Sequence, residues 1–243
     1  MTTFTFRRQT LDFEIFNMVY FNNEYQLPSR FEADDIIIDV GAHIGSFAFA
    51  SLVRGANKLI SIEAHPDNYN LAQQHLTEYI HDSRLDLRWG AVWRSDDHSD
   101  NLFYGNFPIL NDNLSNTGNV EVQTADNGQT TPIWTLDDLI GEQQIRLLKL
   151  DCEGSEFPIL LTSKKLKQID EIVGEFHEFG GDYDHCQANF NLPYYDRYTV
   201  EVLLTHLQSQ GFTTEYQRHE QYIDGEWIPI RLGYFRAIQN KTR

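Results

Sequence analysis

The stretch that decides the fold is Ile36-Ile-Ile-Asp-Val-Gly-Ala-His-Ile-Gly45. It starts as an apolar, β-branched run, which predicts a strand with both faces buried in a parallel sheet. A turn with Gly41 and Gly45 follows, and then a segment rich in Ala, Phe and Leu. A strand, a glycine-spaced turn and a helix in this order bring the backbone against a nucleotide-like ligand at the strand end.

Strand and helix patterns alternate outward from this stretch. Helices are expected over 46–54, from Pro66 to about Tyr79, from Thr135 as N-cap, and over 200–210. Strands are expected over 36–40, 59–62, 85–92 with its exit loop, 145–150, 169–176, 213–218 and 228–238, with a weak strand at 102–104 and a turn signal at Asp224-Gly225. This alternation predicts a three-layer α/β sandwich.

The chain has 243 residues and no Pro/Gly/Ser-rich linker, repeat or low-complexity block, so we expect one compact domain. Residues 1–35 mix aromatic and polar side chains and are predicted to cap a main domain over 36–243. Only Cys152 and Cys186 are present, outside any CxxC pair, and Cys152 is expected to be a small buried residue. The N-terminus has no apolar leader and no spanning segment follows, which predicts a soluble, cytoplasmic protein.

The formal net charge is −17, from 19 basic and 36 acidic residues. Nucleic acids and anionic membranes need a cationic face, so neither is expected as a partner. The acidic residues are spread along the chain, which favours a role in solubility, although such a charge also attracts a cationic cofactor.

The glycine spacing of the turn narrows its ligand. A dinucleotide site uses GxGxxG, whereas Gly41-Ala-His-Ile-Gly45 lacks the middle glycine, so a pyrophosphate would lose its close backbone approach at His43. S-adenosylmethionine carries no phosphate and tolerates this spacing, and its methionine part can lie along the loop where Gly41 and Gly45 avoid a Cβ clash. A tight strand-to-helix turn without a ligand is the simpler alternative.

Glu63 adds to the ligand hypothesis. It ends the second predicted strand, 24 residues after Asp39, where an acidic side chain can accept hydrogen bonds from both ribose hydroxyls. The alternative is a solvated carboxylate at a strand end. The turn and the acid together predict a nucleoside-containing ligand.

Four motifs occur in order: Val40-Gly-Ala-His-Ile-Gly, Ser61-Ile-Glu-Ala-His-Pro-Asp-Asn, Trp134-Thr-Leu-Asp-Asp-Leu and Leu148-Lys-Leu-Asp-Cys-Glu-Gly-Ser-Glu156. Together they resemble the FkbM family of S-adenosylmethionine-dependent methyltransferases, over about residues 34–180, and the last motif is the most specific. The chain departs from the family pattern at His43, where Asn is usual, and at Ala64-His65, where Pro and a small residue are usual. We interpret these departures as changes in the shape of the cofactor pocket.

The resemblance implies a class I methyltransferase fold, a Rossmann-like seven-stranded sheet that is mostly parallel with an antiparallel last strand. It also implies O-methylation of a hydroxyl on a small-molecule acceptor of the sugar, glycan or polyketide type. The cofactor-binding residues that it implies are Asp39, Gly41, Ala42, His43 and Gly45 at the methionine end, Glu63 at the ribose, Asn68 and the Gly90-Ala91-Val92 loop near the adenine, and Asp151 near the methyl group.

Acidic side chains follow the fourth predicted strand. Methyl transfer is an in-line displacement that requires alignment of the acceptor oxygen and a way to remove its proton. Asp151 ends a buried strand at the crevice where ligands bind in open α/β sheets, which favours a site role over a structural one. Glu153 and Glu156 come next, and for Glu156 a stabilising role at the helix N-terminus is the favoured interpretation.

Glu175 and His177 lie two residues apart at the end of the fifth strand, so both side chains point to one face. A histidine near its ordinary pKa of about 6.5 suits a general base, which a carboxylate can orient. The catalytic candidates are therefore His177, Asp151 and Glu175. In a less favoured alternative, these three gather a divalent metal ion.

Two segments are candidates for covering the acceptor. The polar stretch Asn106 to Thr131 is long for a loop without structure, which is typical of lids. An aromatic and polar cluster is the second candidate wall, with packing as its alternative role: Tyr183, His185, Tyr194 and Tyr195.

Two other functions compete with the methyltransferase hypothesis. A nicotinamide oxidoreductase is disfavoured by the missing glycine and by the motif around Asp151. A catalytically silent binding module that keeps the cofactor fold is the other alternative. Association into a homo-oligomer stays open.

Overall fold

The computed structural model describes residues 2–96, 102–109, 114–123, 128–178, 197–223 and 226–240. Several predictions from the sequence lie outside these ranges. They concern the turn at Asp224-Gly225, the residue Cys186, and the wall of Tyr183, His185, Tyr194 and Tyr195.

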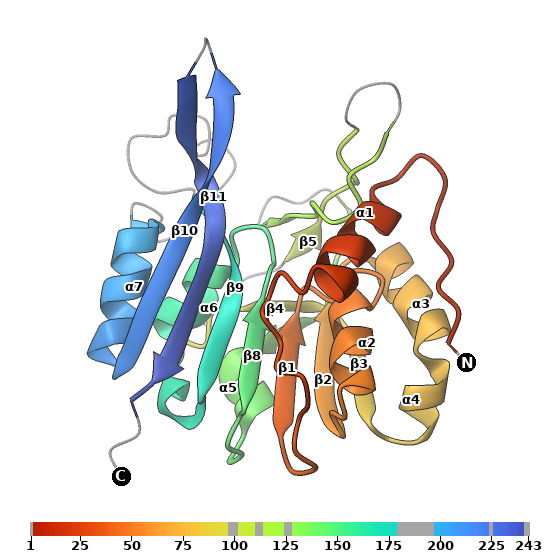
Figure 1. The fold of residues 1–243 in the computed structure, drawn as a ribbon, viewed down its shortest axis with the longest axis horizontal. Helices are drawn as coiled ribbons and strands as arrows, with labels where there is room; N and C mark the ends of the chain where they lie inside the picture. Colours follow the sequence, from red (N-terminus) through yellow and green to blue (C-terminus); the bar gives the residue numbers. More distant parts are fainter. Residues whose placement is uncertain are drawn as a thin grey trace.

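A seven-stranded sheet forms the centre of the molecule (Figure 1), with the spatial order β10-β11-β9-β8-β1-β2-β3. Its strands are β1 (Ile36–Val40), β2 (Lys58–Glu63), β3 (Leu85–Trp89), β8 (Leu147–Leu150), β9 (Glu171–His177), β10 (Phe212–Ile223) and β11 (Glu226–Gln239). The pairs from β3 across to β9 are parallel, whereas β11 is antiparallel to both β9 and β10. The predicted class I methyltransferase fold, with its antiparallel last strand, is confirmed.

Two apolar layers cover the two faces of the sheet. Successive strand side chains point to opposite faces, so the neighbours Ile37 and Ile38, both fully buried, belong to different clusters. The Ile38 cluster contains α5 (Leu136–Ile140), α6 (Glu156–Thr162) and α7 (Val200–Ser209). The Ile37 cluster contains α2 (Ser46–Val53) and the N-terminal segment. The sheet and the two layers that cover it together form the predicted three-layer sandwich.

The N-terminal segment contains α1 (Asp12–Phe16) and a π-helical turn over Asn17–Phe21. Val19, Tyr25 and Phe31 from this segment are buried in the Ile37 cluster. The segment crosses the carboxyl ends of β1 and β2 before the chain enters the sheet (Figure 1). The division into a cap over 1–35 and a domain over 36–243 stays a prediction.

Some element boundaries differ from the predicted ones. The helix predicted to run to Tyr79 is divided at Leu76 into α3 (Pro66–His75) and α4 (Thr77–His81). The exit loop after β3 contains a further strand, β4 (Ala91–Trp93), which pairs with β7 (Ile133–Thr135). A second small sheet pairs β5 (Phe103–Tyr104) with β6 (Val122–Gln123), and a short 3-10 helix lies at Leu166–Gln168. None of the described helices has the length and apolar character needed to cross a membrane.

Candidate functional site

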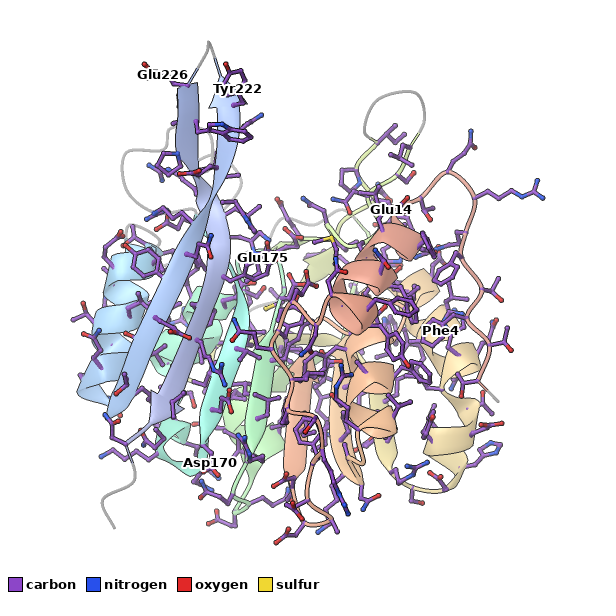
Figure 2. The ribbon with its side chains drawn as sticks, viewed as in Figure 1. Phe4, Glu14, Asp170, Glu175, Tyr222 and Glu226 are labelled. Atoms are coloured by element: carbon purple, nitrogen blue, oxygen red, sulfur yellow. The ribbon has the colours of Figure 1, made fainter. Side chains whose placement is uncertain are left out.

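A cavity lies at the carboxyl ends of the parallel strands, beneath α1 and the segment around residues 116–120. Figure 2 shows Glu175 at this end of the sheet and Asp170 at the opposite end. Of the predicted site residues, those that line the cavity are Gly41, His43, Glu63, Asn68, Ala91, Asp151 and Glu175. Asp39, Ala42, Gly45 and His177 are not among the lining residues.

Close packing within the protein explains the first glycine of the turn. Gly41 has φ +82°, and a Cβ atom there would lie 1.8 Å from the backbone oxygen of Asp151. Lys149 lies under the same turn, where its Nζ donates to the oxygen of Gly41 at 2.6 Å and pairs with Asp39 at 3.3 Å. Asp39 therefore supports the turn from inside the sheet, and the glycine lets β1 and β8 approach closely.

Helix packing explains the second glycine. Gly45 has φ +92°, and a Cβ atom there would lie 2.6 Å from Cδ1 of Leu76. Ala42 is 2 % exposed and lies behind the turn. The atoms that a side chain would meet at both glycines belong to the protein, so packing within the protein by itself requires glycine at both positions. The expected clash with the cofactor stays a prediction.

Glu63, at the end of β2, is a buried carboxylate held by backbone donors. Its Oε2 accepts from the N–H of His43 at 2.8 Å, and its Oε1 accepts from the N–H of His65 at 2.9 Å. Burial raises the pKa of Glu63 to about 7. Oε1 also accepts from the side chain of Asn68 at 3.4 Å, so Oε2 is the oxygen that keeps a lone pair for a further hydrogen bond.

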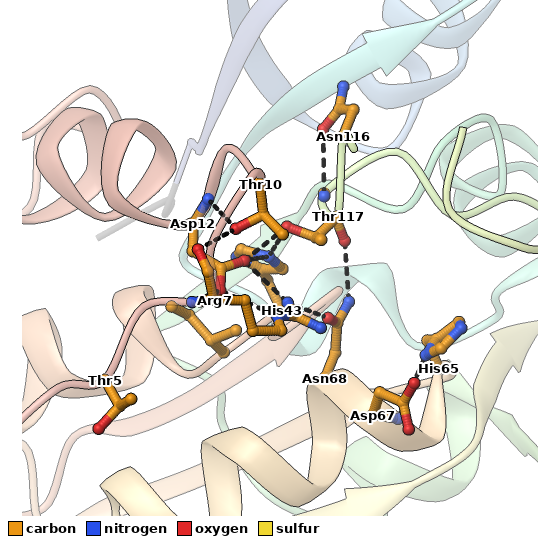
Figure 3. Close-up of polar contacts among 12 residues, drawn as sticks. Thr5, Arg7, Thr10, Asp12, His43, His65, Asp67, Asn68, Asn116 and Thr117 are labelled. Carbon is orange, nitrogen blue, oxygen red and sulfur yellow. Dashed lines mark hydrogen bonds and ion pairs between the residues drawn. The ribbon is translucent and has the colours of Figure 1, made fainter. Parts of the chain in front are cut away.

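A buried polar network joins the turn to two distant segments (Figure 3). Asp12 accepts from Arg7 and from the hydroxyl of Thr117, and the ring of His43 lies 2.9 Å from that hydroxyl through Nε2. The side chain of Asn68 donates to the backbone oxygen of Thr117 at 2.9 Å.

The charges of this network follow from burial and pairing. Burial would raise the pKa of Asp12, but hydrogen bonds from His43 and Arg7 hold it well below its usual value. Burial lowers the pKa of His43, against the attraction of Asp12. A neutral ring at His43 can donate a hydrogen bond through Nε2 to the hydroxyl oxygen of Thr117. That hydroxyl in turn donates a hydrogen bond to Asp12. His43, the unusual residue of the turn, is therefore a structural link to the N-terminal segment.

At the other end of the cavity, residues from the N-terminal segment and β11 join the strand ends. Tyr25 donates its hydroxyl proton to Oδ2 of Asp151 at 2.8 Å, and Tyr234 donates to Glu24 at 3.0 Å. Burial raises the pKa of Glu24 to about 7. These three residues could not be predicted from the sequence, because no local motif surrounds Glu24, Tyr25 or Tyr234.

His177 is enclosed by carboxylates. Its Nε2 lies 3.2 Å from Oε2 of Glu153, and its Nδ1 lies 3.3 Å from Oε1 of Glu156. Burial alone would lower the pKa of His177, but Glu153 and Glu156 outweigh it and raise the pKa well above its usual value. The pKa of His177 is therefore raised rather than ordinary, and its role as a general base stays a prediction.

Glu175 keeps a free approach to the cavity. Its Oε1 pairs with Nε2 of His219 at 3.0 Å, and Oε2 lies 3.9 Å from Nε2 of His177. Burial, with the nearby charge of Asp151, raises the pKa of Glu175 to about 8. This value suits a carboxylate that takes a proton near neutral pH.

One group of potential metal ligands lies among the described residues at this end. It consists of Asp151, Glu153 and His177, whose donor atoms all lie within 4.8 Å of one another. The predicted set contained Glu175 in place of Glu153.

The polar segment predicted as a lid lies over the cavity where it is described. Asn116, Gly118 and Val120 line the cavity, and Thr117 is fully buried beneath α1. A Cβ atom on Gly118 would lie 2.8 Å from Cδ1 of Ile15. Residues 110–113 and 124–127 of the segment lie outside the described ranges.

Comparison with known families identifies one match, the methyltransferase FkbM domain, over residues 39–214. The match covers both glycines of the turn, Glu63, and the strand ends that carry Asp151 and His177. Among curated proteins, none matches the chain.

Three solved structures are similar to this chain. The methyltransferase FkbM from Methylobacillus flagellatus is 16 % identical with a TM-score of 0.52, and the match covers 92 % of this chain and 47 % of that one. An O-methyltransferase from Thermotoga maritima, which depends on S-adenosylmethionine, is 12 % identical with a TM-score of 0.42, covering 99 % and 68 %. TrmK from M. capricolum, solved with S-adenosyl-homocysteine, is 10 % identical with a TM-score of 0.46, covering 90 % and 67 %.

Proposed function

Because the chain belongs to the FkbM family of S-adenosylmethionine-dependent methyltransferases, we propose that it methylates a hydroxyl of a small metabolite. The acceptor is of the sugar, glycan or polyketide type. The observation that carries this proposal is the carboxylate of Glu175, which lines the cavity beside Asp151 with a pKa of about 8. Such a group can take the proton that an alcohol loses when it becomes a methyl ether.

We propose that the cofactor lies along the carboxyl ends of β1 and β2. Glu63 binds the ribose hydroxyls, Asn68 and Ala91 lie near the adenine, and Gly41 and His43 flank the methionine part. Asp39, Ala42 and Gly45 support the turn from behind. A cationic sulfonium is favoured near Asp151, because the carboxylates around it supply negative charge.

The chemistry needs one displacement and one proton transfer. The acceptor oxygen attacks the methyl carbon, the C–O bond forms as the C–S bond breaks, and Glu175 takes the hydroxyl proton. Tyr25 holds the carboxylate of Asp151 through its hydroxyl, which supports a positioning role for Asp151 at the acceptor. A small neutral or cationic acceptor fits the formal charge of −17 better than a nucleic acid does.

The proposal is tested by binding and by turnover. Calorimetry should detect binding of S-adenosyl-homocysteine and no binding of NAD. A panel of sugars, glycans and polyketide alcohols should yield a methyl ether, located by mass spectrometry. Binding without transfer to any member of a broad panel would favour a silent cofactor-binding module, and methyl esters or methylamines as products would contradict methylation of a hydroxyl.

The residue assignment has its own test. Glu175→Gln should lower kcat by about 10² to 10⁴ with little change in affinity for S-adenosyl-homocysteine, since the lost group acts on the proton. Glu215→Gln is the matched control, because Glu215 is an exposed glutamate of β10 outside this cavity. Equal turnover in the two variants would exclude Glu175 as the base.

A further inference from the structure

Three potential metal ligands converge beside the proposed methyl position. Asp151 follows β8, Glu153 lies two residues later, and His177 ends the neighbouring strand β9. Their donor atoms lie within 4.8 Å of one another. Two of the side chains, those of Glu153 and His177, are each 13 % exposed, so this is an enclosed group rather than a solvated acidic patch.

A second carboxylate orients the histidine. Oε1 of Glu156 lies 3.3 Å from Nδ1 of His177, and Glu156 itself is fully buried and accepts from the N–H groups of Cys152 and Gly154. A cation between Nε2 and Glu153 would displace the proton of Nε2, while Glu156 keeps the proton on Nδ1. Metal-binding histidines are commonly held in this way, by a carboxylate on the nitrogen that does not bind the metal.

The charges at this end call for a cation. Glu24, Asp151, Glu153 and Glu175 all line the cavity. Lys149 lies 4.0 Å from Oδ2 of Asp151, but its Nζ is already held by Asp39 and the oxygen of Gly41. Counted as ionised, these four carboxylates outnumber the two cationic groups beside them, Lys149 and a protonated His177.

We propose that Asp151, Glu153 and His177 bind a divalent cation that also contacts the acceptor oxygen. Two carboxylates and one imidazole suit an ion such as Mn²⁺, and three protein ligands leave coordination positions open for substrate. An imidazole nitrogen directed at the carboxylates distinguishes this site from one for an ammonium group, which needs acceptors only. This inference rests on the proposed function for its role in the reaction.

The ion would act as a Lewis acid toward the acceptor. It lowers the pKa of the bound hydroxyl, the proton passes to Glu175, and the resulting alkoxide forms the C–O bond as the C–S bond breaks. Glu175 lies outside the ligand set, paired with His219, and is free for this role.

The site is tested directly by titrating Mn²⁺ into the metal-stripped full chain. Binding is measured as the loss of the free-ion signal in electron paramagnetic resonance. We expect one ion per chain, with affinity weakened by about tenfold or more in Glu153→Gln and in His177→Gln. Glu24→Gln is the matched control, since Glu24 lines the same cavity and loses the same charge but lies outside the ligand set. It should bind Mn²⁺ within about threefold of the unaltered chain.

Two results would overturn the site: no Mn²⁺ binding by the unaltered chain, or equal weakening in Glu24→Gln and Glu153→Gln, which would indicate general charge attraction only. Thermal unfolding of each variant shows whether it folds. If one of Glu153→Gln and His177→Gln does not fold, the other still tests the site. Methyl transfer that continues unchanged after chelation would contradict the metal role and leave the methyltransferase function intact. Mn²⁺ binding without methyl transfer would support the site and contradict the function.

Discussion

We expect Glu63 to make cofactor binding depend on pH. Its pKa of about 7 reflects the burial of a carboxylate whose two oxygens already accept backbone hydrogen bonds. The ionised form keeps a lone pair on Oε2 for a ribose hydroxyl, whereas a proton removes one acceptor. We therefore expect the affinity for S-adenosyl-homocysteine to rise between about pH 5 and pH 8, measured by calorimetry.

The variant Glu63→Gln separates this effect from other titrations. It should bind more weakly, by roughly 1.5–3 kcal/mol for each hydrogen bond to the charged group that is lost, and its affinity should change less with pH. An unaltered affinity in this variant would remove Glu63 from the ribose site.

The same pKa predicts the pH dependence of stability without cofactor. The folded-state pKa of Glu63, about 7, lies above the ordinary value of 4.5, so the folded state binds the proton more tightly. The stabilisation is present below about pH 4.5 and is lost as the pH rises through 7. The Tm of the free protein should therefore fall between pH 5 and pH 8, and it should fall less in Glu63→Gln.

At the scale of elements, the turn after β1 depends on how closely two strands approach. Gly41→Ala would place a methyl group 1.8 Å from the oxygen of Asp151, whereas Gly128, at φ +79°, has nothing within 4 Å. Both substitutions pay the left-handed backbone cost of about 1–2 kcal/mol, but only the first displaces neighbouring backbone. Urea unfolding should show a larger loss for Gly41→Ala by at least about 1–3 kcal/mol. Equal losses would contradict the packing explanation.

Local sequence signals were enough to predict most elements. The β-branched run of β1 and the N-cap Thr135, whose side chain accepts from the N–H of Asp138, act over a few residues and are confirmed. The break at Leu76 was missed because this residue is apolar at a helical spacing and packs under Gly45, a contact 31 residues away. Tertiary packing decided that boundary.

At the scale of the whole molecule, Asp12 connects three separate parts of the chain. It is fully buried, binds Arg7 and Thr117, and lies 3.5 Å from His43 of the turn. Asp12→Ala removes the buried carboxylate that accepts from the partly buried guanidinium of Arg7 and from the hydroxyl of Thr117. We expect unfolding free energy to fall by about 3–5 kcal/mol and cofactor affinity to weaken, by chemical denaturation and calorimetry.

Asp82→Ala is the control for this prediction, because the ion pair of Asp82 with Arg84 lies at the surface with side chains 48 % and 32 % exposed. Such a pair contributes about 0–1 kcal/mol. Similar losses in the two variants would show that the buried network does not hold the N-terminal segment in place.

The candidate site was predictable only where its residues follow strands. Glu63, Asp151 and Glu175 stand at strand ends that a parallel sheet brings to one edge, so the alternation of elements was sufficient. Asp12 and Thr117 are 105 residues apart, and their contact depends on how two irregular segments fold over that edge. The surroundings of His177 were missed for a similar reason, since its pKa depends on a loop from the neighbouring strand.

The reactivity of Lys149 can report whether the centre of the sheet is closed or open. Its side chain is 3 % exposed beneath the turn, whereas Lys58 at the start of β2 is exposed. Amine-reactive reagents reach a lysine only when water can, so acylation will mark Lys58 in the native protein and spare Lys149 until the sheet opens. The ratio of the two labels, read from peptide masses, is a measure of how often the centre of the sheet comes apart.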